Sequence, residues 1–343
     1  MTGLRDRRIA LVGGAGFIGH HLALALAEEG ADVHVVDSLQ VNNLLAVASG
    51  VDGYARNRDL YMQMLSQRLD LLSRAGIPLL VQDARDYHAL GRLLDQIKPQ
   101  VIVHLAAVAH AGRSNKDPFS TFDHSLRTLE NALDYARDNV EHFVFFSSSM
   151  VYGNFESSVV TEDAPLNPIG IYGALKVAGE KIVIAYNQVF GLEYTIVRPS
   201  ALYGPRCVSG RVGQVFVENA LRGEPITVRS DGGGRLDFTY VDDLVQGVCL
   251  ALAHPAARNE TFNLTYGQAR PIADVAEIVL AHFPDVEVRY RDFSDDPFMP
   301  ERGTLDVGKA RRLLGYAPSH PIEVGFARYI DWYEEFLPSP TRA

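Results

Sequence analysis

A glycine-rich loop near the N-terminus constrains the fold more than any other part of the sequence. The short apolar run Ile9–Val12 leads directly into Gly13-Gly-Ala-Gly-Phe-Ile-Gly19, and an apolar helical pattern then continues to Glu29. A buried strand, a glycine loop and a helix in this order are the context of a dinucleotide-binding fingerprint. The glycines allow a tight turn and a close approach to a pyrophosphate, and the helix N-terminus favours the anion. The alternative is an ordinary turn between a strand and a helix.

An acidic residue ends the second predicted strand, 33–37. Asp37 follows the glycines by about 20 residues, the separation at which a carboxylate binds the ribose hydroxyls of adenosine and repels a 2′-phosphate. The next residues, Ser38-Leu-Gln, include no arginine or lysine that would attract such a phosphate. The pattern therefore predicts NAD rather than NADP as the cofactor.

Strand and helix patterns then alternate along the chain. Further apolar runs occur at 78–83, 100–107 and 143–146. This alternation predicts an α/β protein with a Rossmann-like, doubly wound parallel sheet. Asp83, at the end of the third strand, is placed to meet an adenine amino group. The small side chains of Ala106 and Ala107 would leave room for a cofactor.

Hydroxyl and lysine side chains follow the fifth predicted strand. That strand runs into Ser147-Ser-Ser149, and Tyr172 and Lys176 come about 25 residues later, four apart on a predicted helix. On one helix face, the ammonium charge favours the phenolate and makes the tyrosine a better general base. Ligands of such sheets bind beyond the carboxyl ends of the strands, so these groups form a candidate hydride-transfer set. The alternatives are a chance pattern on a solvated helix and serines that only cap a strand.

These motifs resemble those of the extended short-chain dehydrogenase/reductases that act on nucleotide sugars. The glycine loop, Asp37, the Ser-Ser-Ser-Met-Val-Tyr-Gly stretch from Ser147 and the Tyr-Gly-Ala-Leu-Lys stretch from Tyr172 match in order and separation. Three later segments also look like family segments, at 198–205, 237–243 and 310–318. The resemblance covers nearly the whole chain and implies a NAD-dependent enzyme with a nucleotide-sugar substrate.

The resemblance also implies a role for individual residues. Tyr172 would be the catalytic base, Lys176 would support it and hold the ribose, and Ser148 would donate a hydrogen bond to the substrate oxygen. The residues expected at the cofactor are Gly13, Gly16, Phe17, Ile18, Gly19, Asp37, Ser38, Asp83, Ala84, Leu105, Ala106, Ala107, Tyr172, Lys176 and Pro199. The residues expected at the substrate are Ser148, Ser149, Met150, Ala201, Arg211 and Arg302.

One departure from the family pattern favours a particular reaction. Dehydratases of this kind usually have an acidic pair directly after the serine or threonine, where this chain has Ser149 and Met150. Without that carboxyl group, elimination of water lacks its usual acid, which favours an epimerase that inverts a ring carbon, expected to be C4. The alternatives are a dehydratase, a dehydrogenase or a 4-keto-reductase of the same fold, and a non-catalytic NAD-binding regulator.

Other departures affect the expected nucleotide site. Ala201 stands where the family often has asparagine, and Leu236 where it often has arginine, with Arg235 displaced by one position. Arg302 does match a usual diphosphate arginine, and Arg211 lies in the loop that often meets the base. A solvated surface is the alternative for each arginine.

The sequence divides into two predicted domains. Residues 1–200 and about 237–260 are expected to form the NAD-binding domain, and about 201–236 and 261–343 a smaller substrate-binding domain. The segment 39–77 is longer than a plain strand-to-helix connection and predicts a helical excursion. Either it only completes the core, or it forms a lid or an oligomer contact.

Composition limits the partners and the compartment. The formal net charge of −10 argues against nucleic acid or an anionic membrane as the main partner, and no apolar stretch is long enough to span a membrane. Two cysteines, Cys207 and Cys249, and 11 histidines show no metal-binding or disulfide pattern, so no metal site and a cytoplasmic location are expected.

A second apolar stripe on the predicted helix that carries Tyr172 indicates an additional partner. The stripe consists of Ile171, Leu175, Ala178, Ile182, Ala185 and Val189. A helix with two apolar faces packs against two neighbours, one of them the sheet. We expect a two-fold homodimer through the helices around 118–139 and 171–190, as in the resembled family.

Overall fold

The computed structural model describes residues 3–50, 55–108, 111–231, 234–292 and 300–337. His110, which follows the fourth predicted strand and which we expect from the sequence to be a packing or hydrogen-bonding residue, lies outside these ranges.

A seven-stranded parallel sheet forms the centre of the larger part of the molecule, in the order β12-β7-β5-β4-β1-β2-β3. The strands are β1 (Arg8–Val12), β2 (Asp32–Asp37), β3 (Leu79–Val81), β4 (Val101–His104), β5 (His142–Phe146), β7 (Tyr194–Arg198) and β12 (Glu260–Asn263). The central strands are buried on both faces, which is why their sequences read as continuous apolar runs. The predicted doubly wound fold is confirmed.

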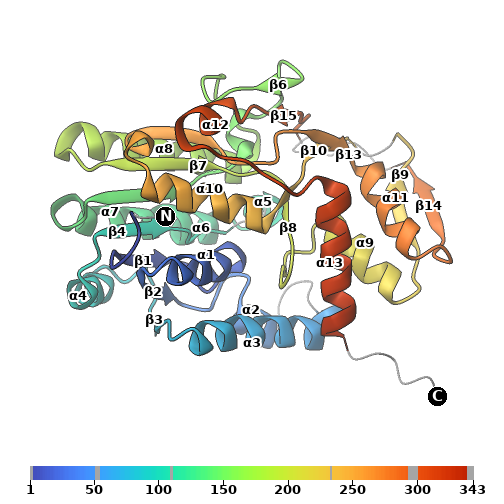
Figure 1. Ribbon diagram of the computed structural model, residues 1–343, viewed down its shortest axis with the longest axis horizontal. Coiled ribbons are helices and arrows are strands. Elements are labelled where there is room, and N and C mark those ends of the chain that lie inside the picture. Colours follow the sequence, from blue (N-terminus) through green and yellow to red (C-terminus); the bar gives the residue numbers. More distant parts are fainter. Residues whose placement is uncertain (1–2, 51–54, 109–110, 232–233, 293–299, 338–343) are drawn as a thin grey trace.

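Helices cover both faces of this sheet (Figure 1). On one face, α1 (Phe17–Glu28) packs beside α10 (Val241–Ala253) over a shared apolar core. On the other face lie α4 (Tyr87–Ile97), α7 (Thr128–Asn139) and α8 (Gly170–Phe190). Two of these helices carry predicted site residues near their N-termini. Helix α1 begins within the glycine loop, and α8 begins two residues before Tyr172.

The helix predicted around 118–139 is interrupted in its hydrogen bonding. It consists of α6 (Pro118–Phe122), a π-helical turn at Asp123–Arg127 and α7. π-helical turns inside α-helices are uncommon and occur often at functional sites. This turn places Asp123 and His124 near the end of β3, where they join the contacts described below.

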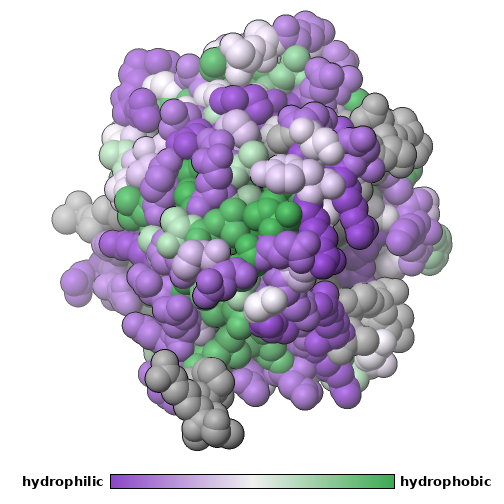
Figure 2. All heavy atoms as spheres, turned by 90° about the vertical axis from the view of Figure 1, so that its right-hand side faces the viewer, coloured by the Kyte–Doolittle hydropathy of each residue, from purple (hydrophilic) through white to green (hydrophobic). Residues whose placement is uncertain are grey.

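A smaller group of elements lies beside the sheet, at the right in Figure 1. It contains α9 (Val212–Leu221), α11 (Ile272–His282), α13 (Ile322–Phe336) and two short pairs of strands, β9 (Ile226–Arg229) with β14 (Val288–Arg291) and β10 (Arg235–Asp237) with β13 (Ala269–Pro271). Seen from this side, the surface is mainly hydrophilic, with apolar residues gathered in a band near its centre (Figure 2). The elements share a core of their own.

The two-domain division stays a prediction. The sheet includes β12, and α12 (Gly308–Leu314) packs against β12 and α10, so part of the segment 261–343 belongs spatially to the larger layer.

The remaining helices and strands are α2 (Leu44–Ala48), α3 (Arg58–Arg74), α5 (Ala111–Lys116), β6 (Val159–Val160), β8 (Leu202–Tyr203), β11 (Thr239–Tyr240), β15 (Thr304–Leu305) and 3₁₀ turns at Ala55–Asn57, Ser149–Tyr152 and Pro255–Ala257.

Gly19→Ala is expected to destabilise the protein by roughly 1–3 kcal/mol, the usual range for overpacking. An added Cβ would lie 2.4 Å from the carbonyl oxygen of Gly14 and 2.5 Å from its Cα, so the glycine loop would have to move. Urea unfolding measures this loss. Gly91→Ala in α4 is the control: its Cβ would meet no atom within 4 Å, and we expect a gain of about 0.5–1 kcal/mol. Equal changes in both variants would contradict the packing argument.

Candidate functional site

A cavity of about 170 Å³ lies at the carboxyl ends of β1, β2 and β4. The expected site residues that line it are Gly13, Gly16, Phe17, Ile18, Gly19, Asp37, Ser38, Asp83, Ala84, Leu105, Ala106, Ala107 and Arg211. The other expected residues are not part of its lining: Ser148, Ser149, Met150, Tyr172, Lys176, Pro199, Ala201 and Arg302. The cavity therefore gathers most of the residues expected at the cofactor and none of the three expected catalytic residues.

The glycine loop leaves no room for side chains on this side of the sheet. Gly13 has a φ of +83°, and a Cβ there would lie 2.6 Å from the backbone nitrogen of Ala106. Gly16 is the N-cap residue of α1, so the first amide groups of that helix open onto the cavity. A backbone cradle at a helix N-terminus fits the diphosphate of a dinucleotide.

Asp37 is fixed at the cavity wall by two backbone amides. Its carboxylate accepts hydrogen bonds from the nitrogen of Ala15 (3.0 Å) and the nitrogen of Leu39 (2.7 Å). Burial raises the pKa of this carboxyl group, while both hydrogen bonds act to lower it. A carboxylate accepts about four hydrogen bonds, so capacity remains for the ribose hydroxyls that the sequence predicted.

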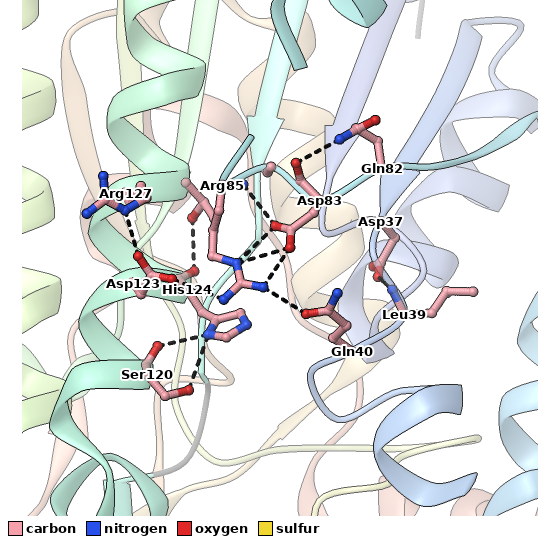
Figure 3. Close-up of polar contacts among 12 residues, drawn as sticks. Asp37, Leu39, Gln40, Gln82, Asp83, Arg85, Ser120, Asp123, His124 and Arg127 are labelled. Carbon is pink, nitrogen blue, oxygen red and sulfur yellow. Dashed lines mark hydrogen bonds and ion pairs between the residues drawn. The ribbon is translucent and has the colours of Figure 1, made fainter. Parts of the chain in front are cut away.

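A network of charges surrounds Asp83 at the same edge of the cavity (Figure 3). The Arg85 guanidinium donates to both oxygens of Asp83, at 2.6 and 3.1 Å, and also reaches Asp123 (3.0 Å) and Gln40 (3.0 Å). Burial acts to raise the pKa of Asp83, but the hydrogen bonds from Arg85 outweigh it and the pKa is lowered. Asp83 is thus held ionised, and its predicted contact with adenine stays a prediction.

Tyr172, Ser148 and Lys176 come together beyond the end of β5. Ser148 lies close enough to Tyr172 to lower the pKa of its hydroxyl group, and Lys176 Nζ donates to the carbonyl oxygen of Phe146 at 2.6 Å. Lys176 Nζ lies 5.9 Å from the centroid of the Tyr172 ring. Asn115 Oδ1 accepts from the backbone nitrogen of Ile171 at 3.0 Å, which helps to fix the start of α8.

Burial changes the acidity of this set in a direction that the sequence did not predict. We expected Lys176 to lower the pKa of Tyr172, but burial raises it, and the lowering contributions come from Ser148, Arg211 and Arg302. Burial lowers the pKa of Lys176 to about 8, against the attraction of Glu180. The prediction that Lys176 brings Tyr172 towards neutrality is therefore wrong for the cofactor-free protein, because both groups are desolvated.

Arg302 joins the expected substrate residues into one cluster. Its Nη2 donates to Ser149 Oγ and to Ser200 Oγ (2.9 Å), and its Nη1 lies 3.0 Å from Met150 Sδ. Burial, and then the like charge of Arg211, lower the pKa of Arg302 to about 10. Two guanidinium groups that repel each other beside Tyr172, the candidate catalytic base, form a natural site for an anion.

Ala201, another expected substrate residue, has an unusual backbone conformation. Its φ is +37°, in the left-handed region that alanine seldom adopts and asparagine tolerates better. The family departure at this position therefore leaves a strained backbone as well as the loss of an amide side chain.

A buried ion pair joins β7 to α8, the helix that carries two of the candidate catalytic residues, and sequence reasoning gave it no role. Arg198 on β7 donates to both carboxylate oxygens of Glu180 on α8, at 2.9 and 2.7 Å, and both side chains are buried. Ser147 Oγ also donates to Glu180, and Arg198 Nη1 donates to the Tyr152 hydroxyl at 2.9 Å. Glu180 follows Lys176 by one helical turn, a spacing that was visible in the sequence.

Sequence reasoning also missed part of the cavity wall. These residues are Val36, Val41, Asn42, Arg68, Gln82, His124, Thr128, Leu202, Cys207, Val208 and Ser209. Most lie in segments without a motif, so no signal in the sequence singled them out. Within the described residues, no group of three or more histidine, cysteine, aspartate or glutamate side chains is arranged to hold a metal ion. None of the helices in these ranges has the length and apolarity needed to cross a bilayer.

Comparison with known proteins places this geometry in a family. Residues 9–265 match the model of the NAD dependent epimerase/dehydratase family. The chain belongs to this family. The predicted membership in the extended nucleotide-sugar short-chain dehydrogenase/reductases is confirmed, and so are an enzymatic function and NAD as the cofactor.

Individual relatives include both epimerases and dehydratases. UDP-glucuronate 4-epimerase 1 of Arabidopsis thaliana is 29% identical over 360 residues, which cover 98% of this chain and 78% of the relative. UDP-glucose 4-epimerase of Thermotoga maritima, solved with UDP-glucose, has a TM-score of 0.82 and 27% identity over 96% of this chain and 99% of that chain. DesIV of Streptomyces venezuelae, a dTDP-glucose 4,6-dehydratase solved with NAD, has a TM-score of 0.80 and 29% identity over 96% and 97% of the two chains.

Lys176→Met is expected to raise the free energy of unfolding of the cofactor-free protein at pH 7. The pKa of Lys176 falls from its ordinary 10.5 to about 8 on folding. Below pH 8 both states hold the proton and the full penalty of burying the charge is present. Between pH 8 and 10.5 the unfolded state binds more protons, so wild-type stability rises with pH and the advantage of the variant shrinks. At 1.36 kcal/mol per pKa unit the advantage at pH 7 is at most roughly 3 kcal/mol.

Urea unfolding of variant and wild type at about pH 7 and about pH 10 measures how far the stability advantage of Lys176→Met shrinks. Lys181→Met, at an exposed position on the same helix, is the control, and its stability relative to wild type should show no comparable dependence on pH. An advantage of Lys176→Met that stays constant over this pH range would contradict the depressed pKa.

Proposed function

We propose that the protein is a NAD-dependent nucleotide-sugar epimerase that inverts C4 by transient oxidation. The observation that carries this proposal is the grouping of Ser148, Tyr172 and Lys176 at the end of β5, together with Ser149 and Met150 where a dehydratase would need an acid. The chain then supplies groups for proton transfer at one hydroxyl and no carboxyl group for eliminating water. Named 4-epimerases among the relatives support the same reaction.

The proposed roles follow from the positions of the side chains. NAD supplies the acceptor and later the donor of a hydride. Tyr172 takes the proton from the O4 hydroxyl while Ser148 holds the same oxygen, and the ketone forms as C4 loses its hydride. After the sugar has turned, Tyr172 returns its proton to O4 as C4 regains the hydride on its other face. Ser148, Arg211 and Arg302 favour the ionised tyrosine, and Lys176 stands ready to hold the ribose.

The diphosphate of the substrate is proposed to bind at Arg302 and Arg211. Burial, and then the charge of Arg211, lower the pKa of Arg302, so a bound diphosphate would relieve the repulsion between the two cations. Ser149 and Ser200 orient Arg302, and Met150 lies against its other nitrogen. A diphosphate bound there would lie near Tyr172, with the sugar over the reacting hydroxyls. The relatives act on UDP and dTDP sugars, so UDP-hexoses are the first substrates to test.

A dehydratase is the second candidate, because DesIV, a dehydratase, is as similar to this chain as the named epimerases are. It would require an acid from outside the Ser149–Met150 turn. Thermal protection across UDP, GDP, dTDP and CDP sugars would find the nucleotide, and product analysis would then separate an inverted sugar from a 4-keto-6-deoxy sugar.

Tyr172→Phe is expected to lower kcat for epimerisation by about 10²- to 10⁴-fold, the usual contribution of a general base. The KM should change little, because the substrate arginines remain. Conversion of UDP-glucose and other UDP-hexoses, followed by chromatography without added NAD, measures the rate. Tyr186→Phe, further along the same helix, is the control and should retain wild-type activity. Unchanged turnover by Tyr172→Phe would remove the tyrosine from the mechanism.

We also propose that two copies pair through α6 to α8. None of the six residues in the second apolar stripe of α8 is fully buried, and Val189 is 72% exposed. Phe119 and Phe122 on α6 and Phe190 at the end of α8 add exposed aromatic surface (83%, 49% and 46%). Large exposed apolar patches of this kind mark interfaces.

The variant Ala185→Glu with Val189→Glu is expected to shift the protein from dimer to monomer, because the two carboxylates would face their copies across a two-fold axis. Light scattering at micromolar concentration measures the mass. Val324→Glu, on α13 at 42% exposure, is the control and should stay dimeric. A monomeric wild-type protein would contradict the proposed dimer.

We propose a cytoplasmic location and a role in carbohydrate biosynthesis. Both cysteines, Cys207 and Cys249, are buried free thiols, which suits a reducing compartment. Nucleotide sugars as substrates support the biosynthetic role.

A further inference from the structure

The excursion between β2 and β3 contributes three residues to the cavity wall, Val41, Asn42 and Arg68. Its main helix, α3, runs below α1 from the foot of α13 back towards β3 (Figure 1). Tyr61, Met64 and Leu65 of α3 pack into the core of the smaller group of elements, while Leu72 packs into the core of the sheet. The excursion therefore spans both parts of the molecule beneath the cofactor cavity.

The N-terminal end of α3 is fastened to the smaller part by a buried carboxylate. Glu218 Oε2 on α9 accepts from Tyr61 OH (2.9 Å) and Asn57 Nδ2 (2.5 Å), and its Oε1 accepts from Gln214 Nε2 (2.7 Å) and Tyr333 OH (2.8 Å). Glu218 is 2% exposed. Four hydrogen bonds to one buried carboxylate fix the position of the helix.

Arg68, further along α3, reaches the cofactor cavity. Its side chain is 1% exposed and lines the cavity together with the glycine loop. Nε and Nη2 of Arg68 both donate to the carbonyl oxygen of Arg206, at 3.1 and 2.5 Å. Arg206 has a φ of +61°, an unfavourable conformation for arginine that turns this carbonyl group towards α3. The guanidinium plane of Arg68 is therefore fixed.

A chain of contacts continues from Arg68 to the glycine loop. Arg206 Nε donates to His20 Nε2 at 2.9 Å, and His20 Nδ1 lies 2.9 Å from the carbonyl oxygen of Gly16. Burial, aided by the nearby His21, Arg68 and Arg206, keeps the pKa of His20 well below its usual range, so His20 is neutral. Neutral His20 accepts from Arg206 and donates to Gly16, and two arginine charges remain close to the N-terminal loop of α1.

We propose that Arg68 binds the diphosphate of the dinucleotide, so that the excursion completes the cofactor site. The glycine loop offers the diphosphate backbone amides, and no acidic side chain lies in the first turn of α1. Arg68 adds a fixed guanidinium, whose planar donors match phosphate oxygens. The proposal rests on NAD as the cofactor and is independent of which sugar reacts.

The diphosphate of the sugar nucleotide would offer the same chemistry, so the ligands in the test must separate the two. Titration calorimetry on cofactor-stripped protein with NAD, ADP, adenosine and UDP does this. ADP carries the phosphates of the cofactor, adenosine lacks them, and UDP carries those of the substrate.

Arg68→Met keeps the length of the side chain and removes its charge, a change that buried sites often tolerate. We expect NAD and ADP to bind about 10- to 100-fold more weakly, as for the loss of a hydrogen bond between charged groups. Adenosine and UDP should bind within about 2-fold of wild type. The dependence of ADP binding on salt should also become shallower. Arg74→Gln, an exposed position on the same helix (76%), is the matched control and should change none of these affinities.

Arg68→Lys provides a second variant, which keeps the positive charge but loses the planar set of guanidinium donors. It should bind ADP with intermediate affinity and adenosine normally, and it remains informative if Arg68→Met does not fold. Unchanged ADP affinity in either variant overturns the proposal. So does an equal loss for adenosine, which would mean a structural role, or a loss for UDP alone, which would assign Arg68 to the substrate. None of these outcomes depends on epimerase activity.

Discussion

The buried ion pair between Arg198 and Glu180 is the interaction on which the catalytic geometry depends. It joins β7 to α8, and through Ser147 it also holds the end of β5. Ser148 and Lys176 are close in sequence to Ser147 and Glu180, so this ion pair and the hydrogen bond from Lys176 to Phe146 together hold the end of β5 against α8. Breaking one side of such a pair costs about 3–5 kcal/mol, because it leaves an unpaired charge buried. Sheet, helix and active site are therefore coupled.

Around this anchor, the site holds charges that are poorly placed for stability and well placed for ligands. Lys176 and Arg302 both have lowered pKa values because the folded chain desolvates them, and Arg211 repels Arg302. A diphosphate, a dinucleotide and an ionised tyrosine would each bring negative charge to these cations. Binding energy and catalysis would draw on the same electrostatics.

The fold and the first half of the site could be predicted because they depend on local patterns. The glycine loop follows a buried strand, Asp37 ends the next strand, and both line the cavity as expected. Arg68 and Arg85 were not predicted, because their roles depend on long-range contacts: Arg68 meets a carbonyl group 138 residues away, and Arg85 meets Asp123 across the sheet edge. The pKa of Tyr172 was misjudged because spacing along a helix gives proximity and says nothing of desolvation. Burial is a property of the whole fold.

The central claim is that a hydride leaves C4 of the sugar and returns to the same carbon on the opposite face. A UDP-hexose labelled with deuterium at C4, incubated with the enzyme without added NAD, tests this directly by mass spectrometry and NMR. The account predicts an inverted product that retains its deuterium at C4. Deuterium exchanged into solvent, or found at C6 of a 4-keto-6-deoxy sugar, would contradict it.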